Sequence, residues 1–331
     1  MSEAFLHRPV MVDEVVELMR TVPPGVVVDA TVGAAGHARA LLEARPDLRL
    51  VGLDRDGDAI AAAAEVLAGV AERVVLRRAR FDEITTTLQE LGHETGTGGD
   101  ISGALFDLGV SSPQLDRPAR GFSYRADGPL DMRMDVRQPL TAADIVNGYA
   151  EEDLSRVLYE HGGERFARRL AHAMVAARPL TTTGELVEVI RATIPAPARR
   201  RGGHPAKRTF QAIRIEVNGE LRLLPDAVDQ AIDVLVPGGR CAVLAYHSGE
   251  DRIVKQRFTR AATGGCTCPP GLPCVCGAQA TVRLLGRRGR RPSPAEVAAN
   301  PRSESARLRA CEKLPVPQAD PPGPGPDGDA A

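Results

Sequence analysis

The chain has 331 residues, of which 43% are hydrophobic, and a formal net charge of −1, so it can bury a large core and suggests about two domains. Six cysteines in this length exclude a small disulfide scaffold. No apolar run reaches the roughly 18 residues of a membrane span, and Met1 to Arg20 carries acids where a signal peptide would be basic, so we expect a cytoplasmic location without membrane contact.

The first half of the chain alternates between helix and strand patterns. Apolar residues at helical spacing predict a helix over Asp13 to Met19, and three β-branched residues, Val26 to Val28, are typical of a central parallel strand. The series continues with a strand at 48–53, a helix at 56–67, a strand at 74–76 and a strand at 101–108. This order predicts an α/β fold with a doubly wound parallel sheet.

The stretch after the first strand has the composition of a nucleotide-binding turn. Asp29 ends the strand, Gly33 and Gly36 allow a tight turn, and a helix beginning near His37 would direct N–H groups toward a ligand. Asp54, at the tip of the second strand, is placed to hold a ribose diol. These features alone also fit a dinucleotide.

Two features favour S-adenosylmethionine over a dinucleotide. Asp29 would attract a cationic amino group and repel a pyrophosphate. The dinucleotide spacing Gly-x-Gly-x-x-Gly is absent, because Thr31 stands at the first glycine position.

Further polar and aromatic residues follow later strands. Phe81 stands where an adenine would lie, although a plain core role is nearly as good an interpretation, and Asp107 and Gln114 follow the fourth strand. Ligands bind doubly wound sheets at the carboxyl ends of the strands, so we expect these three residues to converge there with Asp29 and Asp54.

The alternating rhythm stops between Asp116 and Ile215. Helices are predicted there at 142–149, 151–158, 165–177 and 184–193, and the doubly wound pattern resumes with a helix at 221–236 and a strand at 241–246 that ends before His247. We therefore expect a cofactor domain of residues 1–115 and 216–313, an inserted helical domain of residues 116–215, and a disordered tail over 314–331.

Basic residues cluster in the predicted insert. Arg199, Arg200, Arg201, Lys207 and Arg208 form the first candidate for gripping phosphates, and a second cluster lies at 287–291. Arg120, Arg125, Arg133, Arg165 and Arg214 are further candidates, but some are expected to pair with Asp127, Asp131 and Asp135. Charge clusters are also commonly solvated faces.

Four cysteines, Cys266, Cys268, Cys274 and Cys276, surround a Pro-Pro-Gly turn. Four thiolates so spaced could bind Zn²⁺, but zinc knuckles usually use Cys-x-x-Cys. We assign no metal from the sequence, and reduced surface cysteines are the alternative.

Several long motifs together identify a resemblance. They are Asp-Leu-Gly-Val-Ser-Ser-Pro-Gln-Leu-Asp (107–116), Arg-Gly-Phe-Ser (120–123), Asp-Gly-Pro-Leu-Asp-Met-Arg-Met-Asp (127–135), Gly-Glu-Arg (163–165), Arg-Thr-Phe-Gln-Ala-Ile-Arg-Ile (208–215), Val-Asn-Gly-Glu-Leu (217–221), Tyr-His-Ser-Gly-Glu-Asp-Arg (246–252) and Arg-Ser-Glu-Ser-Ala-Arg-Leu-Arg (302–309). The chain resembles the RsmH/MraW family from about His7 to Lys313. Members of this family use S-adenosylmethionine to methylate the N4 amine of a decoding-region cytidine in 16S ribosomal RNA.

The resemblance implies a Rossmann-like class I methyltransferase sheet, the small-subunit ribosomal RNA as partner, and recognition of that RNA by the inserted domain of residues 116–215. It also implies cofactor contacts from Ala35, Gly36, His37, Asp54, Phe81, Asp107 and Gln114. The chain departs from the family's glycine-rich turn at Ala30 and Ala35, where the family has glycine. Ala35 tolerates a positive φ poorly. A second departure is Gly249, where the family has leucine.

Methyl transfer to an exocyclic amine needs an in-line approach to the sulfonium methyl group, so positioning must supply most of the rate. Ser111, Ser112 and Pro113 form the loop expected to contact the amine. His247 is a candidate base and equally a structural histidine, since the attacked nitrogen becomes cationic and loses its proton easily. A nicotinamide-dependent oxidoreductase and a non-catalytic RNA-binding module are the alternatives. Oligomeric state cannot be predicted.

Overall fold

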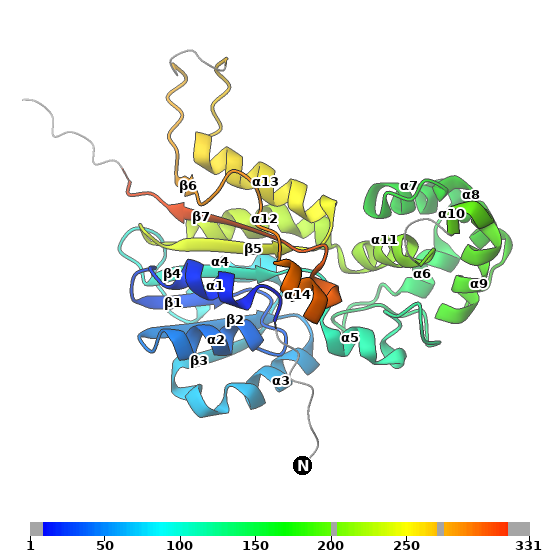
Figure 1. The fold of residues 1–331 in the computed structure, drawn as a ribbon, viewed down its shortest axis with the longest axis horizontal. Coiled ribbons are helices and arrows are strands. Elements are labelled where there is room, and N and C mark those ends of the chain that lie inside the picture. Colours follow the sequence, from blue (N-terminus) through cyan, green and yellow to red (C-terminus); the bar gives the residue numbers. More distant parts are fainter. Residues whose placement is uncertain (1–8, 200–203, 270–274, 317–331) are drawn as a thin grey trace, which may run out of the picture.

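One mixed sheet organises the computed structural model, which describes residues 9–199, 204–269 and 275–316. Within this part of the chain the strand order is β3-β2-β1-β4-β5-β7-β6 (Figure 1). The strands are β1 (Gly25–Asp29), β2 (Leu48–Asp54), β3 (Val74–Arg78), β4 (Ile101–Asp107), β5 (Arg240–Ala245), β6 (Val282–Leu284) and β7 (Arg307–Lys313). The five strands β1 to β5 are parallel, which confirms the predicted doubly wound α/β sheet.

The two remaining strands were not predicted. β7 runs antiparallel to β5 and β6 runs antiparallel to β7. β7 carries four charged residues, Arg307, Arg309, Glu312 and Lys313, so its sequence lacks the continuous apolar run of the central strands.

Helices cover both faces of the sheet. Val27 of β1 packs with α1 (Val12–Met19), α2 (Gly36–Ala44) and α3 (Gly57–Val66). Val26 and Val28 point to the other face, where α4 (Ile84–Glu90), α12 (Glu220–Asp233) and α13 (Ser248–Thr263) pack. This alternation follows from the two-residue period of a strand and explains why all three valines are buried.

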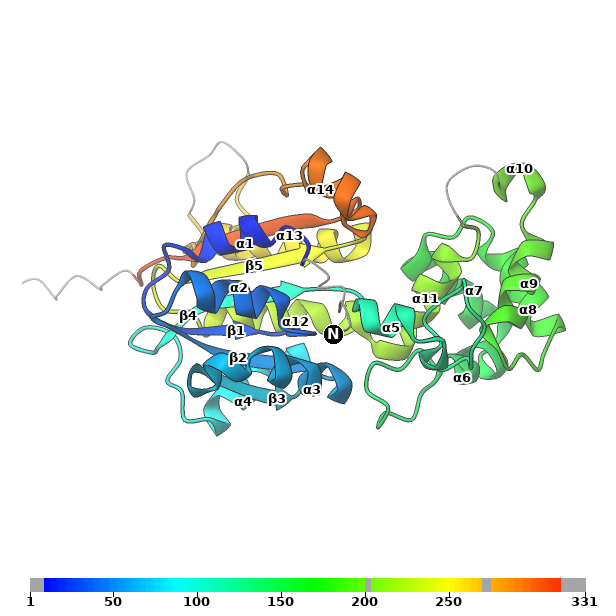
Figure 2. The same ribbon diagram turned by 60° about the horizontal axis from the view of Figure 1, so that its bottom comes forward.

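A group of helices lies to the side of the sheet on which β4 continues into α5 (Ser112–Asp116), as Figures 1 and 2 show. It has its own core, which includes Leu154, Leu170 and Ile213. The helices are α6 (Ala142–Gly148), α7 (Glu151–Gly162), α8 (Ala167–Ala176), α9 (Thr183–Thr193), α10 (Ala196–Arg199) and α11 (Lys207–Asn218). α11 crosses the predicted boundary at residue 215 and leads directly into α12, so the exact limits of the insert stay a prediction.

Side-chain caps set the starts of the predicted helices. Thr141 caps α6 through the N–H of Asp144, and Thr182 caps α9 through the N–H of Glu185. α7 ends at Gly163, whose φ of +58° lies in the left-handed region that glycine favours.

Two expectations concern the ends and membranes. The predicted tail falls mostly outside the described residues, and Leu314, its first residue, is still tied to the fold because its N–H donates to the Thr281 carbonyl at 2.9 Å. Among the described helices, none combines the length and the apolar composition that spanning a bilayer would require.

Candidate functional site

Asp29 ends β1 as a buried carboxyl group with 2% of its surface exposed. Its Oδ1 accepts a hydrogen bond from the Thr31 N–H at 3.2 Å. The pKa of Asp29 is raised to about 8, mainly by burial and also by the nearby carboxylates of Asp107 and Asp54, whereas the hydrogen bond from the Thr31 N–H opposes the shift. The three acids predicted from strand ends β1, β2 and β4 therefore lie close enough to interact, and this edge of the sheet favours a cation.

Asp54 connects the tip of β2 to the turn after β1. Its Oδ2 accepts from the Gly33 N–H at 3.0 Å, and its Oδ1 accepts from the Asp56 N–H at 2.9 Å. Burial raises the pKa of Asp54 to about 6, although these two N–H groups oppose the shift. Asp54 thus holds the shape of the turn.

The turn after β1 places an alanine where glycine is usual. Ala35 has a φ of +60° and is fully buried. A non-glycine residue in this region costs about 1–2 kcal/mol, so the predicted poor fit of Ala35 is a real conformational cost that the turn tolerates. At Gly36 no side chain fits, because a Cβ there would lie 2.4 Å from Pro9 Cγ.

Asp107, at the end of β4, is the centre of a second network. Its N–H donates to Thr31 Oγ1 at 2.6 Å, and its Oδ1 accepts from the Tyr246 hydroxyl at 2.6 Å. Oδ2 lies 3.5 Å from His37 Nδ1, and His37 Nε2 lies 2.9 Å from the Val10 carbonyl oxygen. Burial raises the pKa of Tyr246, and the Asp107 carboxylate raises it further.

Thr31 and Tyr246 were not predicted as site residues. Tyr246 follows β5 directly, so the same strand-end argument that selected Asp107 would have found it. Thr31 was considered only because it stands where the dinucleotide-binding pattern requires glycine.

Gln114 links the loop after β4 to the start of α3. Its Nε2 donates to Asp56 Oδ2 at 2.8 Å, and its Oε1 accepts from the Ser111 N–H at 3.1 Å. The same Asp56 oxygen accepts from Arg120 Nη2 at 2.9 Å. Asp56 itself caps α3 by accepting from the Asp58 N–H at 3.1 Å. The Gln114 amide is therefore engaged at both ends within the protein.

The predicted acceptor loop is a capped helix start. Ser111 caps α5 by accepting from the Gln114 N–H at 3.4 Å, and Pro113 lies in the first turn of the helix. Ser112 Oγ accepts from Arg302 Nη1 at 2.6 Å, and Arg302 Nη2 lies 2.9 Å from Asp116 Oδ1. Arg302 was quoted within a family motif, but no local pattern predicts this contact.

Phe81 begins a short 3₁₀ turn at 81–83 after β3 and is partly buried against the core of the sheet. Its ring meets that of Phe106 edge to face, with centroids 6.4 Å apart. The core role is thus observed, and stacking on an adenine stays a prediction.

His247 caps α13. Its Nδ1 accepts from the N–H groups of Gly249 at 3.2 Å and Glu250 at 3.4 Å. Nε2 lies 3.2 Å from Glu250 Oε1, outside hydrogen-bonding geometry, and has no hydrogen-bond partner among the described residues. Burial alone would raise the pKa of Glu250, but the contact with His247 and the charge of Arg214 hold it below its ordinary value. The Nδ1 lone pair is occupied, which favours the structural role of His247 over that of a base.

Three of the arginines predicted to bind phosphate instead form ion pairs with carboxylates of the protein. Arg214 forms a bidentate pair with Glu220 at 2.8 Å, Arg133 pairs with Asp131 at 2.7 Å, and Arg120 pairs with Asp56. The Asp131 pairing was expected, whereas the partners of Arg120 and Arg214 were not.

The main predicted cluster lies only partly within the described residues. Lys207 and Arg208 are exposed at the start of α11, and Arg199 ends α10, whereas Arg200 and Arg201 lie outside the described residues. α11 would span about 17 Å from Lys207 to Asn218 at 1.5 Å per residue. Lys207 and Arg208 therefore lie at the end of α11 that is farther from the sheet, as Figure 2 shows.

The sheet is Rossmann-like, with acidic residues at three strand ends, and, together with the family match that follows, it places this protein among the S-adenosylmethionine-dependent methyltransferases. A family model described as the MraW methylase family matches residues 4–314, so the chain belongs to that family.

Curated relatives agree over nearly the whole chain. A protein of Symbiobacterium thermophilum named ribosomal RNA small subunit methyltransferase H is 52% identical over 316 residues, covering 94% of this chain and 98% of the relative. One of the same name from Acidothermus cellulolyticus is 55% identical over 318 residues, covering 94% of each.

Solved structures share less with this chain. An rRNA methylase of Streptococcus thermophilus has a TM-score of 0.41 at 13% identity, and the match covers 94% of this chain and 100% of that protein. An S-adenosylmethionine-dependent O-methyltransferase of Thermotoga maritima has a TM-score of 0.40 at 9% identity, covering 93% and 66%. The family assignment rests on the sequence matches alone.

Proposed function

We propose that this protein transfers the methyl group of S-adenosylmethionine to the exocyclic N4 amine of a cytidine in the decoding region of 16S ribosomal RNA, in the cytoplasm. The observation that carries the proposal is the cluster of Asp29, Asp54 and Asp107 at three strand ends in a member of the MraW methylase family. The curated relatives carry the name of a small-subunit ribosomal RNA methyltransferase.

The residues at the strand ends fit the proposed cofactor. S-adenosylmethionine carries an ammonium group and a sulfonium centre, and Asp29 is a buried carboxyl group whose ionisation would be stabilised by such a cation. Asp54 would hold the ribose hydroxyls and Asp107 would contact the adenosine portion, with Ala35, Gly36 and His37 forming the floor of the site. Gly33 and Ala35 both have positive φ angles, which turn the backbone sharply around the proposed cofactor site. A dinucleotide pyrophosphate would face repulsion from the same three acids, which disfavours the oxidoreductase alternative.

The reaction forms an N–C bond to the cytosine N4 as the S–CH₃ bond breaks, leaving S-adenosylhomocysteine, and N4 then loses one proton to water. When bound, the cofactor supplies an activated methyl group. The protein's part is to orient the amine, and in this proposal Ser111, Ser112 and Pro113 do so from the start of α5. Gln114 contributes by fixing that loop to Asp56, because its amide is already engaged at both ends.

The helical insert would hold the RNA around the target base. Single-stranded RNA is recognised by phosphate contacts and by splaying out of bases. The exposed Lys207 and Arg208, together with their sequence neighbours Arg199 to Arg201, would grip phosphates away from the reacting base. The partly buried, paired Arg214 and Arg120 would instead hold the insert against the sheet.

The experiment is methyl transfer from S-adenosylmethionine labelled in the methyl group to small ribosomal subunits that lack the modification. Label should enter the RNA only when the protein is present. Calorimetric titration with S-adenosylhomocysteine tests the cofactor independently, and reduced nicotinamide dinucleotide serves as the comparison ligand. Binding of RNA without binding of S-adenosylhomocysteine would favour a non-catalytic RNA-binding module.

A further inference from the structure

A cluster of cysteines lies at the far end of α13 from the candidate site. α13 has 16 residues, so its end lies about 24 Å from its start at the His247 cap. Cys266 and Cys268 follow this end, and Cys276 lies on the returning arm that leads to β6. A methyltransferase site at the strand ends makes no use of these side chains.

Backbone contacts hold the two arms of this loop together. The Thr281 N–H donates to the Ala261 carbonyl at 2.9 Å, and the Thr281 hydroxyl donates to the same carbonyl at 3.3 Å. A Cβ at Gly264 would lie 2.3 Å from the Gln279 carbonyl oxygen, so the arms approach as closely as glycine permits. The cysteines are therefore brought together by the fold on both sides of the loop.

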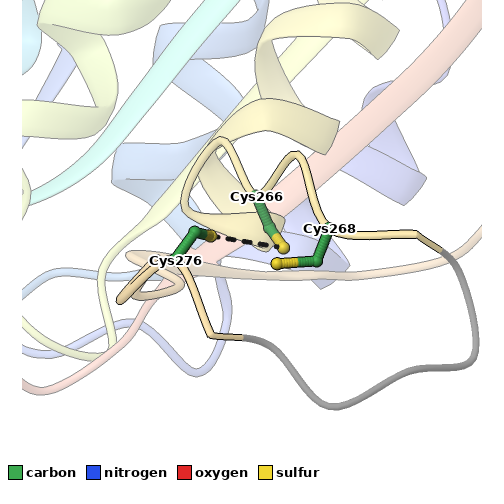
Figure 3. Close-up of side chains that lie close together, drawn as sticks. All are labelled: Cys266, Cys268 and Cys276. Atoms are coloured by element: carbon green, nitrogen blue, oxygen red, sulfur yellow. Dashed lines mark hydrogen bonds between the residues drawn. The ribbon is translucent and has the colours of Figure 1, made fainter.

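The three sulfur atoms face one another, as Figure 3 shows. Each Sγ of Cys266, Cys268 and Cys276 lies within 4.8 Å of the others, and the Cys266 and Cys276 sulfurs are 3.6 Å apart. Thiolates at about 2.3 Å from a tetrahedral zinc ion are separated by about 3.8 Å. The observed spacing needs only small side-chain adjustment to reach this arrangement.

We propose that Cys266, Cys268 and Cys276 bind one Zn²⁺ ion as three thiolate ligands, and that the ion closes the loop between α13 and β6. The sequence alone led to no metal assignment, because Cys-x-Cys pairs are unusual in zinc knuckles. The structure answers that objection by geometry, since the Sγ atoms of the Cys266 and Cys268 pair lie within 4.8 Å of each other and of the Cys276 Sγ, which comes from the returning arm. Cys274 lies outside the described residues, and the proposal rests on the three described thiols.

The composition of the loop supports a structural role for the ion. Cys266 and Cys268 are only partly buried and Cys276 is exposed, and Val275 beside them is 89% exposed. No apolar core of the described residues forms inside the loop, so a metal would supply the cross-link that packing does not. A disulfide between Cys266 and Cys276 would use two of the three thiols and leave the approach of Cys268 unexplained.

The test uses the full chain purified without chelators under anaerobic, reducing conditions. Elemental analysis should find about one zinc per chain, and exchange with Co²⁺ should give the absorption bands of tetrahedral thiolate coordination. The Cys266→Ser and Cys276→Ser single variants and the double variant should lose the ion and these bands. The matched control, Thr267→Ser, changes a residue between two ligands and should keep both.

Circular dichroism and thermal unfolding of each variant check that the fold survives, and methyl transfer should stay at the wild-type rate because the loop is distant from the site. Wild-type protein that is free of zinc and gives no cobalt bands would overturn the proposal. So would bands that persist in the folded double variant, or a Cys266–Cys276 disulfide found by peptide mass spectrometry in the reduced preparation.

Discussion

The guanidinium group of Arg302 donates to the hydroxyl oxygen of Ser112 at 2.6 Å, across 190 residues of sequence. Arg302 follows α14 (Pro294–Ala299) and precedes β7, whereas Ser112 begins α5 at the end of β4. The second nitrogen of Arg302 reaches Asp116 at the other end of α5. The C-terminal segment therefore grips the loop that we propose to orient the acceptor amine.

This contact predicts a positioning role for Arg302. Arg302→Met should lower single-turnover methyl transfer by about 10- to 100-fold, because small displacements of reacting groups are costly. Affinity for S-adenosylhomocysteine should stay unchanged. Arg302→Lys should recover only part of the rate, since lysine lacks the two-pronged geometry. Arg20→Met, at an exposed arginine after α1, is the control. A wild-type rate for Arg302→Met would mean that the loop is held by other contacts.

Asp29 predicts a specific dependence of stability on pH. Its pKa is 3.8 in the unfolded chain and about 8 in the folded protein, so its contribution is fully present below pH 4 and is lost as pH rises toward 8. Between these limits the unfolding free energy of the wild type should fall relative to that of Asp29→Asn, by about 1.4 kcal/mol per pH unit. Asparagine can still accept from Thr31. Urea unfolding of both proteins from pH 4 to 9, without cofactor, measures the difference. Parallel curves would show that Asp29 is not a buried, protonated acid.

Replacing Asp54 should reduce the affinity for the cofactor. Replacement by alanine removes the proposed charged hydrogen bonds to the ribose and should weaken binding of S-adenosylmethionine by about 1.5–3 kcal/mol. It also releases the Gly33 and Asp56 N–H groups, so Asp54→Asn, which keeps an acceptor, should lose less. Calorimetry measures both, with Glu65→Gln on exposed α3 surface as the control. Unchanged affinity of Asp54→Ala would remove this residue from the site.

The cluster of Arg199, Arg200, Arg201, Lys207 and Arg208 predicts the salt dependence of RNA binding. Changing all five to glutamine should weaken binding and flatten the slope of log affinity against log salt by as much as about 4. Cofactor affinity should not change. The control variant changes Arg20 and Arg39, which form exposed pairs on the sheet domain. If both variants kept the wild-type slope, the cluster would not contact phosphate.

For Arg214, which pairs with the buried Glu220, we expect an effect on stability and none on RNA binding. Its removal leaves Glu220 buried without its partner, so Arg214→Met should destabilise the protein by about 3–5 kcal/mol. The salt slope of the folded variant should match that of the wild type. If Arg214→Met instead reduced the salt dependence of RNA binding without lowering stability, Arg214 would have to contact RNA phosphate.

The acidic strand ends could be predicted from the sequence, because the mainly apolar runs of β1, β2 and β4 stop at Asp29, Asp54 and Asp107. Residues that act through long-range contacts could not. Asp56 and Arg302 owe their contacts to which strands and helices become neighbours, whereas Tyr246, directly after β5, was open to the strand-end argument. The pairing of Arg214 with Glu220 depends on how α11 meets α12. Likewise, β7 was missed because its charged residues mask the strand pattern, and only its neighbour β5 makes it part of the sheet.

The most direct measurement is to digest the RNA of small ribosomal subunits after incubation with the protein and S-adenosylmethionine, and to identify the methylated nucleoside by mass spectrometry. The subunits must come from cells that lack this modification, and the Asp107→Ala variant serves as the inactive control. We predict one new methyl group per subunit, on the N4 nitrogen of a cytidine in the decoding region. A methyl group on a ring carbon or a ribose oxygen, or no methylated nucleoside from a protein that binds S-adenosylhomocysteine, would contradict the proposed reaction.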